Sequence, residues 1–281
     1  MNDNYIPSFN DKDNQSPELM SFGEHLEEFR RYLIKIVIVV FSTFIILLFF
    51  KNFLFNIVIL SPREPWFLTN ALLCKLSVAL NIHGLCINSV PLKLINIQLT
   101  GQFTAYMLVT FIASLILTFP YILWQLWLYV KPAFFHYEIV KFNKFISITS
   151  LLFITGVLFG YFIIVPLTIN FLGTYKVSAE VDNTISLMSY ISTVSFLTLI
   201  MGVVFQLPLF IYFISKAGLI SPQLMRKNRK IVIVIILIIS AVITPTTDAF
   251  SQLIVAIPLY FLYELSIFIC RKQNLKSNIL A

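Results

Sequence analysis

The chain has 281 residues, of which 58% are hydrophobic and 12% are charged, and its formal net charge is +7. An average soluble domain carries roughly 25% charged residues, so this composition excludes a soluble globular protein and indicates a polytopic membrane protein. The positive charge does not indicate a nucleic-acid partner, because the basic residues separate apolar runs and do not gather on a polar surface. We interpret them as charges that orient the chain in a bilayer.

The chain reads as one membrane domain, residues 21–272, between two short tails. Residues 1–20 are polar, contain two prolines and lack the features of a cleaved targeting segment, so we predict a disordered tail. Residues 273–281 are predicted to form a short C-terminal tail. A spanning helix needs about 20 apolar residues. The apolar runs predict six transmembrane helices, near residues 33–55, 103–130, 145–171, 190–215, 230–244 and 250–270.

The lysines and arginines predict the orientation of these helices. If the N-terminus is cytoplasmic, fifteen of the twenty lie in cytoplasmic segments. The positive-inside rule then puts both termini in the cytoplasm, or in the matrix or stroma of an organelle. The opposite side carries a large loop, 56–102, a smaller loop, 172–189, and a tight turn, 244–248. The fifth helix is short, so it must thin the bilayer or lie among longer neighbours.

The sequence contains no sign of a metal site, a cofactor or a catalytic centre. Its three cysteines and three histidines show no recurring ligand spacing. Cys74 and Cys86 both fall in the large outer loop. We interpret them as ordinary residues, although pairing in an oxidising compartment stays open. There is no Walker loop, no GxSxG and no HExxH, so we expect a protein that is not an enzyme.

The functional candidates are acidic and amide side chains beside or inside the apolar helices, because such groups are costly at membrane depth. They are Glu27, Glu28, Glu138, Gln206, Asp248, Gln252 and Glu264. A structural role is the alternative for three of them. Glu27 and Glu28 have the spacing to cap a helix and pair with Arg30 and Arg31, and Glu138 precedes Lys141 by about one turn.

Five segments carry a family resemblance, in matching order and at matching spacing from about residue 22 to residue 270. They are HLEEFRRYL (25–33), FPYILWQLWLYVKPAFFHYE (119–138), FGYFIIVPLTINFL (159–172), FQLPLFI (205–211) and ITPTTDAFSQLIVAIPLYFLYE (243–264). They resemble the TatC family, the polytopic core of the twin-arginine protein translocase. The resemblance implies an all-α integral membrane protein whose six helices form a curved, cupped bundle, with prolines that bend the helices.

The resemblance also implies a function. The chain would be a twin-arginine signal-peptide receptor and the core of a translocase that moves folded proteins by using the proton gradient. Glu28 and Glu138 would hold the arginine pair, with Glu27 as a weaker auxiliary and Arg30 as the residue that orients the carboxylates. Carboxylates suit this task because they accept bidentate, charge-assisted hydrogen bonds from guanidinium groups.

The implied partners are twin-arginine signal peptides, single-span TatA-type or TatB-type subunits, the lipid bilayer and further copies of the chain. Thr244 and Gln252 match positions that dock the partner helix, although they could instead satisfy backbone groups freed by Pro245. Two positions depart from the family. Gln206 stands where many relatives carry a glutamate, and Tyr32 stands where relatives often carry arginine or lysine.

The source and the function class leave alternatives open. Abundant Phe, Ile, Asn, Lys and Tyr with only 8 Gly are typical of an AT-rich genome. We therefore favour an organelle-encoded protein of the mitochondrial inner membrane over a bacterial cytoplasmic membrane or a plastid thylakoid. An ion or solute carrier would be expected to have charged or glycine-broken segments at mid-bilayer and related halves. A membrane assembly scaffold without a cargo site is the other alternative, which the glutamine at 206 favours.

Overall fold

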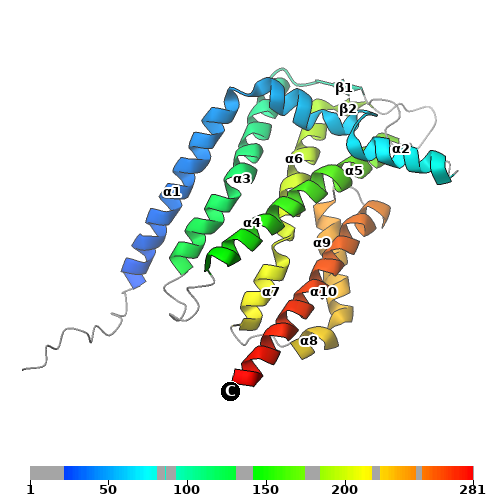
Figure 1. Cartoon of the computed structure of the whole chain (residues 1–281). Helices are drawn as coiled ribbons and strands as arrows, with labels where there is room; N and C mark the ends of the chain where they lie inside the picture. Colours follow the sequence, from blue (N-terminus) through cyan, green and yellow to red (C-terminus); the bar gives the residue numbers. More distant parts are fainter. Residues whose placement is uncertain are drawn as a thin grey trace, which may run out of the picture.

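The computed structural model is all helical apart from one two-stranded sheet (Figure 1). It describes residues 22–80, 86, 93–130, 142–174, 184–216, 222–244 and 249–280. The predicted disordered tail, 1–20, lies outside this range. In Figure 1 the helices lie side by side between a lower end, where α1 begins and α3 ends, and an upper end, where α1 ends and the strands lie.

The elements follow one another in this order: α1 (Phe22–Leu48), η1 (Phe53–Ile59), η2 (Ser61–Arg63), α2 (Leu68–Leu80), β1 (Leu94–Ile95), α3 (Gly101–Val130), α4 (Phe142–Phe159), η5 (Gly160–Ile164), α5 (Val165–Thr174), β2 (Ile185–Ser186), α6 (Leu187–Val204), α7 (Leu207–Lys216), α8 (Pro222–Lys227), α9 (Arg229–Ile243) and α10 (Ala249–Leu280).

Four helical stretches of the described chain are long and apolar enough to cross a membrane. They are Leu26–Leu48, Gly101–Tyr129, Ile146–Thr174 and Leu187–Ser215. They coincide with the first four predicted helices. The fifth and sixth predicted helices are also present, as α9 and α10, but α9 has 15 residues and the apolar part of α10 covers Gln252–Phe268. Six membrane spans therefore remain a prediction.

The predicted end of the first helix near 55 is wrong, because α1 ends at Leu48. Two further predicted boundaries are also wrong. The first helix was predicted to begin near 33, but the amphipathic stretch FGEHLEEFRRY continues it back to Phe22. The last helix was predicted to end near 270, but α10 continues to Leu280, so residues predicted as a C-terminal tail belong to a helix. In both cases polar residues extend an apolar helix, which hydropathy alone does not detect.

Prolines shape the helices in different ways. Pro120 and Pro258 lie inside helices that continue past them, α3 and α10. Pro208 follows a break at Phe205 and Gln206, where α6 ends and α7 begins. Pro166 follows the π-helical segment η5. A proline removes one donor from the helical ladder and clashes with the carbonyl four residues earlier, which accounts for both irregularities.

The helix α4 and its continuation η5 cross α6 at three glycines. A Cβ on Gly156 would come within 2.7 Å of the Met201 carbonyl oxygen, and one on Gly202 would lie 2.6 Å from Phe153. A Cβ on Gly160 would lie 2.8 Å from the Met201 Cβ. Without side chains at these positions the two backbones approach closely, and van der Waals packing holds helices together in lipid. This crossing forms the centre of the bundle.

The large outer loop, predicted as 56–102, forms a folded cap over the upper end. Within it, η1, η2 and α2 run across the bundle (Figure 1), and β1 pairs in parallel with β2 from the second loop, with Leu94 opposite Ile185. Tyrosine hydroxyls from three different spans donate to backbone carbonyls in or next to this cap. The donor and acceptor pairs are Tyr106 with Leu48, Tyr161 with Val58, and Tyr190 with Ile59.

The cap also contains a disulfide. We interpreted Cys74 and Cys86 as ordinary residues, but the structure joins them, which decides the open alternative in favour of pairing. Cys74 lies on α2 and Cys86 lies beyond the end of that helix. A sequence separation of 12 is compatible with pairing only if the chain turns back along α2, and hydropathy carries no information about that turn.

We predict that Gly156→Ala destabilises the fold, because the added methyl group meets a backbone carbonyl that cannot move without shifting α6. Overpacking of this kind costs about 1–3 kcal/mol. The thermal unfolding midpoint of the purified protein in detergent should fall. Gly23→Ala, at an exposed position of α1, is the matched control and should leave the midpoint unchanged or raise it slightly. Equal midpoints for the two variants would contradict the close crossing.

Candidate functional site

The two adjacent glutamates near the start of α1 have different surroundings. Glu27 lies on the exposed side, where its carboxylate is 3.3 Å from the Arg31 guanidinium and 3.9 Å from that of Arg30. Glu28 is half-buried, on the same side of the helix as the half-buried Phe29 and Tyr32. Among the described residues, Glu28 has no hydrogen-bond or ion-pair partner. Pairing with Arg30 and Arg31, one part of the structural alternative, is therefore seen for Glu27 and not for Glu28.

Aromatic contacts fix the face of α1 that carries Glu28. The ring of Phe29 lies 5.0 Å from that of Tyr129, and the ring of Tyr32 lies 6.0 Å from it in an edge-on arrangement. Tyr129 is next to the last residue of α3. Glu28 is thus held at the lower end of the bundle, beside the point where the chain leaves α3. Glu138 falls in 131–141, outside the described residues.

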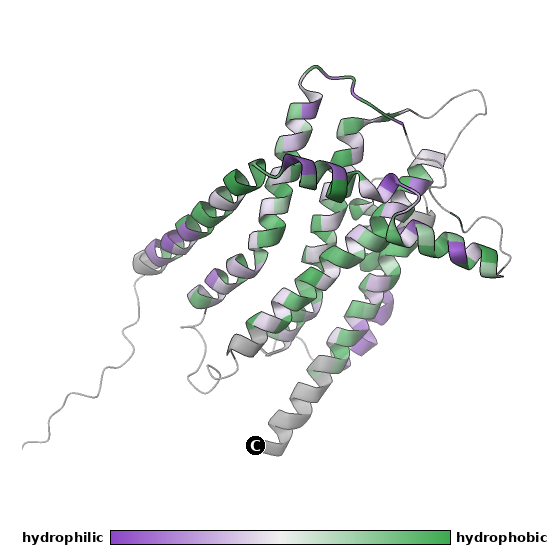
Figure 2. Cartoon of the chain, turned by 45° about the horizontal axis from the view of Figure 1, so that its top comes forward, coloured by the Kyte–Doolittle hydropathy of each residue, from purple (hydrophilic) through white to green (hydrophobic). Residues whose placement is uncertain are grey.

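The lower end is also where charge collects on the described chain. Figure 2 shows hydrophilic residues at the start of α1 and again around α8 and the start of α9, with apolar helices between them and the upper end. Besides Arg30 and Arg31, Lys35 lies here, with its Nζ 5.4 Å from the centre of the Tyr32 ring. Relatives often carry a cationic side chain at position 32. In this chain the Tyr32 ring instead contacts the ammonium group of Lys35, one turn later.

A second charged cluster joins α9 to α10. The Arg229 guanidinium donates to Glu264 at 2.9 Å, and the Tyr260 hydroxyl donates to the other oxygen of the same carboxylate at 3.1 Å. Nearby, the Tyr263 hydroxyl donates to the Met225 carbonyl oxygen at 2.9 Å and ties α8 to α10. We had named Glu264 as a candidate from its position, but sequence did not reveal its partner. Its carboxylate is engaged within the chain, so the structure assigns it a packing role.

Gln206 is buried at the break between α6 and α7. Its Nε2 donates to the Thr149 carbonyl oxygen on α4 at 3.3 Å, while its buried Oε1 has no hydrogen-bond partner in the described chain. Gln125 on α3 is similar, since its Nε2 donates to Tyr121 and its buried Oε1 lacks a partner. Sequence pointed to Gln206 as an intramembrane polar residue and missed Gln125, which interrupts an otherwise apolar helix.

Thr244 and Gln252 both lie where α9 and α10 meet at the upper end. Thr244 is 4% exposed, and its hydroxyl donates to the Ser240 carbonyl oxygen at 2.9 Å. The Nε2 of Gln252 donates across the hairpin to the Leu237 carbonyl oxygen at 2.8 Å, and the side chain is half-buried. The acceptors are the carbonyls of Ser240 and Leu237, whereas a proline at 245 frees the carbonyl of Ala241, so these bonds do not serve the group named in the structural alternative. Pro245 and Asp248 lie outside the described residues.

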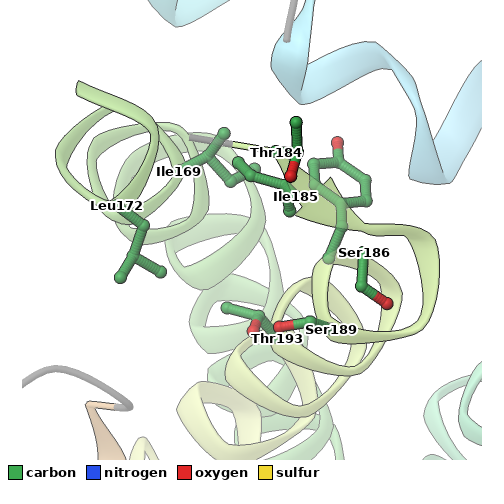
Figure 3. Close-up of a pocket in the computed structure, with 8 residues that line it drawn as sticks. Ile169, Leu172, Thr184, Ile185, Ser186, Ser189 and Thr193 are labelled. Carbon is green, nitrogen blue, oxygen red and sulfur yellow. The ribbon is translucent and has the colours of Figure 1, made fainter. Parts of the chain in front are cut away.

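A pocket lies at the upper end, between α5 and the β2–α6 connection (Figure 3). Its volume is about 460 Å³, and its lining residues are uncharged: Ile169, Leu172, Thr184, Ile185, Ser186, Ser189, Tyr190 and Thr193. A pocket without a carboxylate does not suit an arginine pair. Among the described residues, no three His, Cys, Asp or Glu side chains come together to hold a metal ion. The unpaired Glu28 remains the best candidate for recognising a cation.

Comparison with known proteins decides the family. A model of the Sec-independent protein translocase protein TatC matches residues 24–258. The chain belongs to the TatC family. It is 40% identical over 252 residues to TatC of Blattabacterium sp. subsp. Periplaneta americana, covering 89% of this chain and 94% of that one. It is 30% identical over 259 residues to TatCy of Bacillus subtilis, covering 92% of each.

Solved structures agree with this assignment. The crystal structure of the twin-arginine translocase receptor TatC in DDM matches with a TM-score of 0.69 at 31% identity, covering 88% of this chain and 99% of that one. A second crystal structure of the same receptor matches with a TM-score of 0.65 at 30% identity. The chain is therefore an integral, multi-pass component of a protein translocase, as the sequence resemblance implied.

The preferred compartment is corrected by the same relatives. Those named here are bacterial, so the mitochondrial inner membrane is not supported. The bias toward Phe, Ile, Asn, Lys and Tyr reflects the base composition of a genome and carries no information about which membrane receives the protein.

We predict that Arg229 and Glu264 are energetically coupled. Removing either charge leaves the other half-buried without its partner, whereas Arg229→Met with Glu264→Met removes both. Because both side chains are partly exposed, a double-mutant cycle on detergent unfolding should give a coupling of about 1 kcal/mol. Glu27→Met with Arg31→Met, an exposed helical pair, should give a smaller coupling. Strictly additive effects at 229 and 264 would show that the contact contributes nothing to stability.

Proposed function

We propose that this chain is the twin-arginine signal-peptide receptor and core subunit of a Tat translocase. The observation that supports it best is the half-buried carboxylate of Glu28, which lacks a partner among the described residues, at the lower end of the bundle. A carboxylate in such a position is costly unless a cation binds it. A signal peptide supplies that cation as a guanidinium.

The geometry of α1 favours an arginine pair over a single charge. Glu28 lies beside the end of α3, because Phe29 and Tyr32 pack on Tyr129, and Glu138 follows Tyr129 by nine residues in the sequence. Two carboxylates on neighbouring elements can each accept two parallel hydrogen bonds from one guanidinium, which an ammonium cannot supply. Glu27 is occupied by Arg30 and Arg31, so it acts at most as a weaker auxiliary, and the arginines orient it.

The family assignment supports the rest of the proposal. The lower end faces the cytoplasm of a bacterium, so both termini are cytoplasmic and α9 and α10 complete six spans. Folded cargo then crosses the membrane under the proton gradient. The array of helices from α1 to α10 would receive the apolar part of the signal peptide, and further copies of the chain would assemble around it.

A single-span TatA-type or TatB-type subunit is proposed to dock against the α9–α10 hairpin. Its contact with Gln252 is favoured over that with Thr244, because Gln252 is half-exposed whereas Thr244 is 4% exposed. The exposed side chains Leu253, Ile257 and Phe261 continue the same helix and offer an apolar surface to a neighbouring helix.

The other function classes find less support. An ion or solute carrier is expected to have charged groups in the middle of its spans. Within the described spans 101–129, 146–174 and 187–215 the sequence has no Asp, Glu, Lys or Arg. A scaffold without a cargo site gives no reason for an unpaired carboxylate beside an ion-paired one.

We predict that Glu28→Gln weakens binding of a twin-arginine peptide about tenfold or more, because each lost charge-assisted bond is worth roughly 1.5–3 kcal/mol. Glu138→Gln should act similarly. Glu27→Gln is the matched control, one residue away, and should have a smaller effect. Photo-cross-linking of the peptide to the assembled protein in membranes is the measurement, with a twin-lysine peptide as the specificity control. An undiminished yield in the Glu28→Gln, Glu138→Gln double variant would exclude the receptor site.

We also predict that a cysteine placed by Gln252→Cys forms a disulfide cross-link with a cysteine in the TatA-type helix. Thr244→Cys should cross-link less, because its side chain is buried. Leu151→Cys, exposed on α4, is the control for non-specific contact in the membrane. If Gln252→Cys reacts only with lipid-soluble thiol reagents, the hairpin is not the docking surface.

A further inference from the structure

The helix α2 has its apolar and polar faces exchanged relative to a helix on a water-soluble protein. One side carries Leu68, Leu72 and Leu76, which are 65%, 55% and 42% exposed. Leucines spaced four residues apart form one stripe along a helix. Only one charged side chain, Lys75, shares that exposed side.

Away from this stripe, α2 carries polar side chains that are bonded to the rest of the protein. The Asn70 side chain is 1% exposed and donates to the carbonyl oxygens of Pro62, at 3.0 Å, and Glu64, at 2.8 Å. The Thr69 hydroxyl donates to the Phe162 carbonyl oxygen. In an α-helix that carbonyl would accept from the N–H of residue 166, but residue 166 is a proline and has none. Cys74 is bonded to Cys86. The helix is therefore fixed, and rotation cannot bury its leucines.

We propose that α2 is an interfacial helix, embedded by the stripe Leu68, Leu72 and Leu76 in the phospholipid leaflet at the upper end. A helix with an apolar exterior and a polar, hydrogen-bonded interior is the pattern expected where the surrounding solvent is lipid. At 13 residues α2 is about 20 Å long, too short to span a bilayer. It lies across the direction of α1 and α3 (Figure 1), as a helix in the plane of the interface does.

Three features favour lipid over a second protein as the partner. Exposed apolar side chains recur along the chain from the membrane helix α1 to α2, at Phe49, Phe53, Ile57 and Trp66. Tryptophan is enriched at the level of lipid head groups. Lys75 can extend its ammonium group to the lipid phosphates while its stem lies along the stripe. Figure 2 shows the same mixture on α2, an apolar helix marked by few hydrophilic residues.

The test is tryptophan fluorescence in proteoliposomes made with phosphatidylcholine brominated on its acyl chains, which quenches indoles in contact with lipid. The background carries Trp66→Phe, Trp124→Phe and Trp127→Phe, which remove the three native tryptophans. Leu72→Trp then reports on the stripe, and Leu76→Trp repeats the measurement one turn later. Gln98→Trp, at an exposed position of the same cap, is the matched control. Only variants that retain the Cys74–Cys86 disulfide are compared.

We expect the indole of Leu72→Trp to lose most of its emission in brominated lipid and to be shielded from aqueous acrylamide, with Gln98→Trp giving the opposite pattern. Quenching of both variants by acrylamide alone would mean that the stripe faces water. Protection of Leu72→Trp from both quenchers would mean that protein covers it, either a second copy or another subunit. Either result overturns the proposal and leaves the receptor function of Glu28 untouched.

Discussion

Backbone carbonyls that leave the helical ladder at the membrane surface need donors, and the rest of this structure depends on how that need is met. A carbonyl without a donor costs several kcal/mol in hydrocarbon. Here four side-chain hydroxyls supply the donors. Their pairs with carbonyls are Tyr106 with Leu48, Tyr161 with Val58, Tyr190 with Ile59, and Thr69 with Phe162. Each bond joins a residue within 48–69 to a membrane span that is distant in sequence. The hydrogen bonds that these carbonyls need therefore also hold the cap on the bundle.

The same arrangement determines where the carboxylate of Glu28 lies. Among the described elements α1 packs mainly against α3 and occupies the edge of the array. Its upper end is held because Tyr106 on α3 bonds to the last residue of α1, and its lower end is held because Phe29 and Tyr32 contact Tyr129. Glu28 thus stands on a helix fixed at both ends by one neighbour. An edge position leaves the lower end of α1 open to a peptide, which a central helix would not.

How much of this could be read from the sequence depends on the residue. The apolar runs predicted the spans, because a bilayer requires hydrophobic length. They could not predict α2, whose leucines face outward and whose polar side faces the protein. The pairing of Cys74 with Cys86 depends on a chain reversal that no local pattern encodes. The difference between Glu27 and Glu28 was accessible in principle, since helical phase puts Glu28 with Tyr32, but only the contact with Tyr129 shows which face is covered.

Gln206 stands where many relatives carry a glutamate, and the fold gives a physical reason for the amide. Gln206 lies buried at the break before Pro208, and its amide donates a hydrogen bond to the Thr149 carbonyl oxygen on α4. An ionised glutamate would offer only acceptors and would repel that oxygen, whereas the amide Nε2 donates to it. A neutral residue also avoids the cost of a buried charge. In this chain, then, the position serves helix packing: the amide of Gln206 joins the break between α6 and α7 to α4.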